Sequence, residues 1–145
     1  MKYEFTKTPC KGGQAWLDNQ PDAKTAWETC ERVDWMWWAL RCSKKSQPSK
    51  ETSVKFAEWC ARRAKKYAVA DAAADAAADA AYAAAYAADV AYAADVADAA
   101  AYAAYAAAYA ADVAYAADVA DAADAAAAER KEQADWIRKN CKWNG

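Results

Sequence analysis

The side chains that could do chemistry in this chain are cysteines and aspartates, because the sequence contains no histidine. No two of its five cysteines form a C-x-x-C pair, and a zinc site of the usual kind needs such spacing and commonly histidine as well. An odd number of cysteines also does not suit a complete disulfide framework. We therefore expect no metal site, no cofactor and free, mostly buried thiols. The cysteines are Cys10, Cys30, Cys42, Cys60 and Cys141.

None of the familiar catalytic constellations is present in the sequence. A cysteine nucleophile would lack a histidine base, and no pair of aspartates is singled out for acid–base work. Gly12 and Gly13 alone are too few for a Gly-rich phosphate-binding loop. The sequence therefore predicts a protein that is not an enzyme and has no catalytic residues.

The charges of the 145-residue chain are unevenly distributed, although the net charge is only −2. Residues 1–67 hold 14 Lys and Arg against 8 Asp and Glu, and residues 129–145 hold 5 against 3. The region between them, residues 68–128, holds 10 Asp and no basic residue. An acidic surface of this kind either folds against basic segments or faces a basic partner. A plainer interpretation is that Asp keeps an Ala-rich helix in solution.

Three regions follow from this composition: a basic, Trp-rich head (1–67), an Ala/Asp/Tyr-rich helical repeat (68–128) and an amphipathic tail helix (129–145) that packs on the head. Alanine is the best helix former, and no β-strand pattern appears. The predicted fold class is all-α, with a Trp-rich head of short helices and long Ala-rich helices in a hairpin or bundle. Asp interrupts the Ala-rich stretch too often for a membrane span, and residues 1–13 lack the apolar region of a signal peptide. The expected location is the cytoplasm.

The head is predicted to contain short helices at residues 12–20, from Pro21 onward and at 35–42. Pro21 opens the second helix with Asp22 in its first turn, and Asp34 caps the third. A longer helix starts near 49–53 and presents an inner stripe that includes Phe56 and Cys60. Its basic outer band consists of Arg62, Arg63, Lys65 and Lys66.

The middle region repeats itself, because residues 75–100 are nearly copied at residues 98–123. An offset of 23 residues corresponds to six turns plus roughly 140° at about 100° per residue. One straight helix therefore cannot keep a single Tyr/Val seam through both copies. We expect the chain to bend back between the copies with close Ala-to-Ala packing, although no Gly or Pro marks the turn. Assembly of two or more chains through the Ala-rich helices is the alternative.

The tail helix predicted at residues 129–144 carries a stripe of Ala134, Ile137 and Cys141, flanked by Trp136 and Trp143. This stripe has no local partner in the sequence. We expect it to pack on the head near Phe56, Cys60 or Trp27.

Two segments resemble a known family. The head sequence from Cys10 to Leu17 and from Ala26 to Trp38, and the tail sequence from Glu129 to Lys139, are similar to small bacterial and phage immunity proteins with an Ala-rich helical region. The resemblance implies a non-enzymatic protein that binds and neutralises a protein partner, either a toxin or a host protein. It implies no catalytic residues.

The acidic helical surface is the expected contact site for such a partner, because Tyr is favoured in interfaces and Asp steers basic partners. Two other functions remain open. One is a structural or ice-binding Ala-rich rod, and the other is an acidic mimic of DNA. Nucleic-acid binding by Trp35, Trp37 and Trp38 is a further hypothesis, although a compact head core explains these residues better. The candidate partner-binding residues are Asp89, Tyr92, Asp95, Asp112, Tyr115 and Asp118.

Overall fold

The computed structural model describes residues 4–43, 45–67, 71–89, 93–114 and 119–144, and their side chains except at 71–74, 88–89, 93–94, 97, 113–114 and 119–121. Within these ranges the protein is all-α, as predicted, and an isolated bridge between Phe5 and Ser43 is the one β-type pairing. The helices are α1 (Lys11–Asp18), α2 (Ala23–Thr29), α3 (Val33–Cys42), α4 (Lys50–Ala64), η1 (Lys65–Tyr67), α5 (Asp71–Asp89), α6 (Ala93–Ala114) and α7 (Val119–Asn140).

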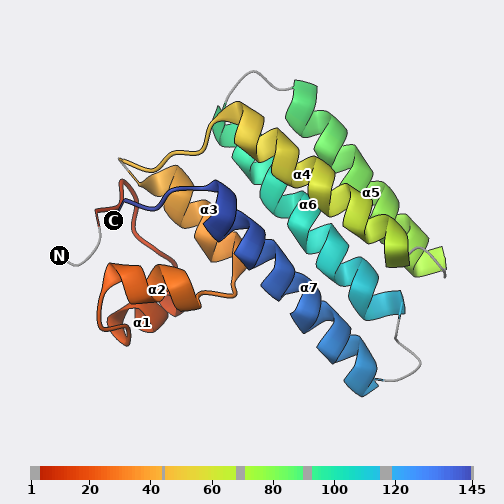
Figure 1. Cartoon of the computed structure of the whole chain (residues 1–145), viewed down its shortest axis with the longest axis horizontal. Coiled ribbons are helices and arrows are strands. Elements are labelled where there is room, and N and C mark those ends of the chain that lie inside the picture. The colour runs from red at the N-terminus through yellow and green to blue at the C-terminus, as the bar shows by residue number, and fades with distance from the viewer. Residues whose placement is uncertain (1–3, 44, 68–70, 90–92, 115–118, 145) are drawn as a thin grey trace.

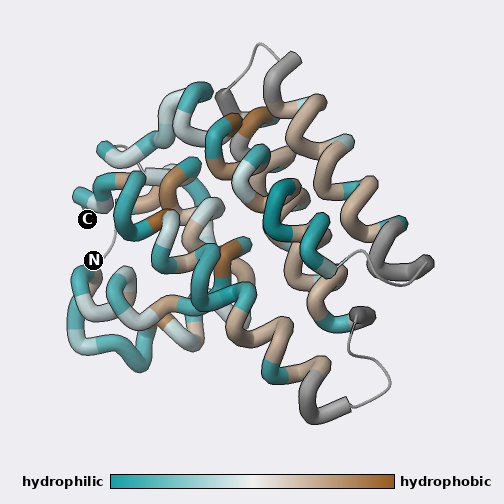
Figure 2. Tube along the Cα trace, turned by 45° about the vertical axis from the view of Figure 1, so that its right-hand side comes forward, coloured by the Kyte–Doolittle hydropathy of each residue, from teal (hydrophilic) through white to brown (hydrophobic). Residues whose placement is uncertain are grey.

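The helices α4, α5, α6 and α7 run in alternating directions and form a bundle, with α1, α2 and α3 gathered at one end (Figure 1). The central element is α6, which packs against α3, α4, α5 and α7. Along the long helices the mild hydrophobicity of alanine is broken at intervals by hydrophilic positions (Figure 2). No described helix has the length and apolar character needed to cross a bilayer.

The chain bends back, as predicted, because α5 ends at Asp89, α6 begins at Ala93 and the two helices pack on each other, but the bend lies inside the first copy and α6 runs through the predicted place between the copies. The next helix end comes at Ala114, close to the equivalent point in the second copy. Both helix ends therefore fall at matching points inside the two copies, without Gly or Pro at either boundary.

The core between the long helices is made mostly of alanine, in line with the expected Ala-to-Ala packing, together with Val96. Ala80 and Ala87 of α5 and Ala100, Ala103 and Ala107 of α6 are fully buried. Alanine lets helix backbones approach closely. A tyrosine at these positions would force the helices apart, and the described tyrosines of α5 and α6 are exposed.

The helix starts in the head differ from the prediction at two aspartates. Asp22 lies outside α2 as its N-cap and accepts a 2.7 Å hydrogen bond from the Thr25 backbone N–H. Asp34 was expected to cap α3, but α3 begins at Val33 with Arg32 at the cap position and no side-chain cap. Asp34 lies in the first turn, where the helix dipole favours a carboxylate. The long helix α4 starts as expected, since the Ser49 side chain caps it.

The tail packs on the head, as predicted. Ile137 and Cys141 are buried, and the Trp136 ring lies 5.0 Å from the Phe56 ring between centroids. Trp143 stacks on Trp27 with 5.2 Å between centroids. The helix that carries this stripe, α7, starts well before residue 129 and ends at Asn140, so it extends into the region assigned to the repeat.

Candidate functional site

The exposed face of α6 carries one regular stripe of acidic and aromatic side chains. Its positions are separated by alternating steps of three and four residues, which places them on one side of a helix. All six side chains are exposed, while most described α6 residues between them are buried alanines. We call this set the α6 stripe. It consists of Asp95, Asp98, Tyr102, Tyr105, Tyr109 and Asp112.

The three tyrosines at the centre of the α6 stripe form a stacked ladder. The Tyr102 and Tyr105 rings are 6.5 Å apart between centroids, and the Tyr105 and Tyr109 rings are 6.3 Å apart and nearly parallel, at 3°. Their exposed fractions are 49%, 67% and 47%. Large aromatic side chains exposed to this extent and in contiguous contact are typical of binding surfaces.

A related stripe lies on α5, because the repeat places equivalent residues there. Asp75 and Asp79 are exposed, and Tyr82 and Tyr86 are 72% and 47% exposed. We call these four residues the α5 stripe. Each Ala-rich helix therefore buries an alanine face and exposes an Asp/Tyr face. The repeat doubles the exposed aromatic and acidic surface.

The charges of the α6 stripe are mostly uncompensated within the described structure. Asp98 pairs with Arg41 of α3, which ties the head to the start of α6. No ion pair is recorded for Asp95 or Asp112, and both side chains are exposed. The tyrosine ladder is therefore bracketed by negative charge, which raises the local concentration of basic groups.

Two of the candidate residues named from the sequence, Asp95 and Asp112, lie in the α6 stripe, one at each end. Tyr92, Tyr115, Asp118 and the side chain of Asp89 lie outside the described residues. Tyr102, Tyr105 and Tyr109 were not among the candidate residues, although the sequence placed tyrosines on the expected contact surface. The signal that could have identified them is their three–four spacing with aspartates at both ends.

Among the described side chains, no group of three or more Cys, Asp or Glu is placed to hold a metal ion. The described cysteines are all free thiols, and only Cys10 is exposed. The exposed aromatic and acidic side chains on α5 and α6 suit recognition of a partner at the surface.

Comparisons of the chain with models of protein families, with curated proteins and with solved structures found no match. The resemblance to immunity proteins therefore stays a prediction.

Proposed function

We propose that this protein is a non-enzymatic binding protein that docks a basic protein partner on the α6 stripe and blocks that partner's activity. The observation that carries the proposal is the exposed Tyr102–Tyr105–Tyr109 ladder between Asp95 and Asp112. Tyrosine supplies large contact area at a low entropic cost and is enriched in interface hot spots. The flanking aspartates select a basic partner and accelerate its approach.

The shape of the stripe favours a helical segment as the docking element of the partner. Alternating steps of three and four residues match the spacing by which one helix presents a straight seam to another. A partner helix that bears Lys or Arg beside small apolar residues would pair with the aspartates and cover the tyrosine rings. The role that the family resemblance implies, neutralising a toxin or host protein, is compatible with such a surface.

The direct test compares partners captured from a lysate of the source cells by three forms of the protein. The stripe variant carries Tyr102→Ala, Tyr105→Ala, Asp95→Asn and Asp112→Asn. The charge-matched control carries Asp124→Asn and Glu132→Gln, two exposed changes on α7. A partner of the proposed kind is retained by the wild type and the control and binds the stripe variant about tenfold or more weakly.

The salt dependence of binding completes this test. Raising the ionic strength should slow association with the wild type and have less effect on the stripe variant. Equal binding of any captured partner by the stripe variant and the control would refute the proposed surface. Displacement of the partner by duplex DNA would point instead to the DNA-mimic alternative. Thermal hysteresis in the absence of any partner would support an ice-binding rod, although the innermost alanine faces of α5 and α6 are buried.

A further inference from the structure

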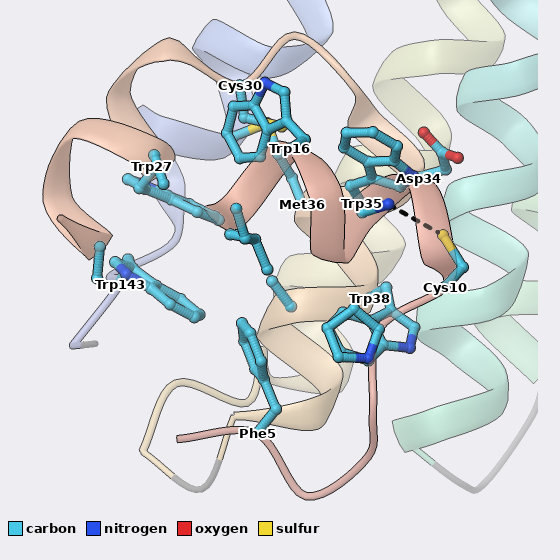
Figure 3. Close-up of a pocket in the computed structure, with 16 residues that line it drawn as sticks. Phe5, Cys10, Trp16, Trp27, Cys30, Asp34, Trp35, Met36, Trp38 and Trp143 are labelled. Carbon is cyan, nitrogen blue, oxygen red and sulfur yellow. Dashed lines mark hydrogen bonds between the residues drawn. The ribbon is translucent and has the colours of Figure 1, made fainter. Parts of the chain in front are cut away.

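The head contains a cavity of about 260 Å³ whose walls are apolar and include several aromatic rings (Figure 3). It lies among α1, α2, α3, the N-terminal segment and the C-terminal segment that follows α7. Figure 3 shows rings from all of these elements arranged around the space. The aromatic lining residues are Phe5, Trp16, Trp27, Trp35, Trp38 and Trp143.

The aromatic walls are held in place by contacts with one another. Trp143 stacks on Trp27 at 10°, and Phe5 lies edge-on to Trp38 with 4.9 Å between centroids. On another side, the Trp16 and Trp35 rings are 5.8 Å apart between centroids. Ring pairs at these separations stabilise each other's orientation. The rings that form the cavity are therefore already ordered before a ligand binds, which lowers the entropic cost of binding.

The wall that bears Trp27 and Trp143 is further anchored by α7. The Arg138 guanidinium donates to the backbone carbonyl oxygens of Trp27, at 3.2 Å, and of Cys30. These bonds close the end of α2, where the last carbonyl groups lack helical partners. The same helix thus supplies the anchor for α2 and leads into Trp143.

The cavity carries almost no net charge. Asp34 is the one charged residue among those that line it, and Arg32 donates two hydrogen bonds to its carboxylate, at 2.9 and 2.7 Å. Burial by itself would raise the pKa of Asp34, but the hydrogen bond and charge of Arg32 lower it, so the pair is ionised. The Arg32 guanidinium also lies over the Trp35 ring, at 4.5 Å. A cationic ligand would have to compete with Arg32 for both groups.

We propose that this cavity binds a small, neutral, planar aromatic molecule of about the size of naphthalene. A dry apolar cavity of about 150 Å³ accommodates benzene, and a volume of about 260 Å³ accommodates a second fused ring. Indole rings offer faces and edges for offset stacking. The carboxylate of Asp34, the one charged residue in the lining, is already paired with Arg32, so the cavity offers no free counter-ion to a charged ligand. This site is separate from the α5 and α6 stripes and does not depend on their proposed function.

The test measures fluorine NMR of fluoronaphthalene in the presence of the full-length protein. The wild type should broaden and shift the signal, and unlabelled naphthalene should reverse the effect. Ala39→Phe and, separately, Ala23→Leu fill the cavity from α3 and α2, because both half-buried alanines line it. Each should weaken binding by about tenfold or more. Ala61→Phe, a half-buried position on α4 that does not line the cavity, is the matched control.

The charge of the ligand is tested by competition between tert-butylbenzene and phenyltrimethylammonium, which have nearly the same shape. The neutral compound should displace fluoronaphthalene at lower concentration. Tighter binding of the cation would overturn the proposal, since it would indicate an aromatic cage for ammonium groups. The absence of binding to the wild type would overturn it as well. So would wild-type affinity in every cavity-filling variant whose helical circular dichroism is intact.

Discussion

The Arg63 Nε donates to both carboxylate oxygens of Glu129, at 2.8 and 3.0 Å, and joins α4 to α7 inside the bundle. The Glu129 side chain is fully buried, and it also accepts hydrogen bonds from Tyr67, at 3.3 Å, and from Gln133. Gln133 donates in turn to the Ala104 carbonyl oxygen of α6, at 2.9 Å. Alanine surfaces alone specify helix register weakly, because they have little relief. This polar network therefore defines how α4, α6 and α7 align.

We predict that Glu129→Ala destabilises the protein by about 3 kcal/mol, because it leaves the guanidinium of Arg63 without its buried partner. Glu129→Gln should cost less, since the amide still accepts one of the hydrogen bonds. Urea denaturation followed by circular dichroism measures both. Glu132→Ala is the control, because its side chain is exposed on the same helix. Equal losses for the two alanine variants would show that the network contributes nothing to stability.

The anchor between α7 and α2 gives a second prediction. Arg138→Met keeps much of the side-chain length but leaves the carbonyl oxygens of Trp27 and Cys30 without their donors. Hydrogen bonds from a charged group contribute about 1.5–3 kcal/mol, so the free energy of unfolding should fall by about 2 kcal/mol. Tryptophan fluorescence should report the change in the head. Arg130→Met, at an exposed position, should have little effect, and a similar loss there would contradict the assignment.

The alanine core should tolerate larger side chains poorly. Ala107→Leu places a large side chain at a fully buried contact of α6 and should cost about 1–3 kcal/mol through overpacking. Tyr105→Ala removes a much larger group but should change stability by only about 0.5 kcal/mol, because the ring is 67% exposed. Thermal and urea denaturation of the two variants compare them directly. The reverse order of effects would show that tyrosines, and not alanines, form the seam.

The buried thiols should make stability depend on pH in the alkaline range. Burial raises the pKa of Cys141 from 9.0 to about 11, and burial together with the nearby Glu129 carboxylate raises the pKa of Cys60 well above its ordinary value. The unfolded thiol ionises first, so the Cys141 contribution is complete below about pH 9 and is lost as the pH rises through about 11.

Urea denaturation across this pH range measures the loss. The difference in unfolding free energy between the wild type and Cys141→Ala should shrink by about 2 kcal/mol between pH 9 and pH 11. Cys10→Ala is the comparison variant, since the Cys10 thiol is exposed. A constant difference for Cys141→Ala would show that its thiol does not titrate in this range.

The all-α fold, the folding back of the Ala-rich region and the docking of the tail followed from the sequence alone and are confirmed, whereas the bend lies inside the first copy and not between the copies. Each of these predictions depends on a property that can be read from a single segment of the sequence. Alanine propensity gives the long helices, the 23-residue offset excludes a single straight seam, and the stripe of Ile137 and Cys141 needs apolar partners. The start of the long helix near residue 49 was also predicted, and Ser49 caps it there.

Only the tertiary structure decided which face of each Ala-rich helix is buried. The sequence predicted close Ala-to-Ala packing but did not say which residues of each helix lie at the contact. In the folded chain, close helix packing selects the smallest side chains and leaves the Tyr102–Tyr109 ladder exposed. The tertiary structure also decided the role of Arg63. The sequence placed this residue in the basic outer band of the long helix, but in the folded chain it pairs with buried Glu129. The sequence predicted that the tail would pack near Trp27, but only the tertiary structure shows that Trp27, Trp143 and rings from α1 and α3 enclose a cavity.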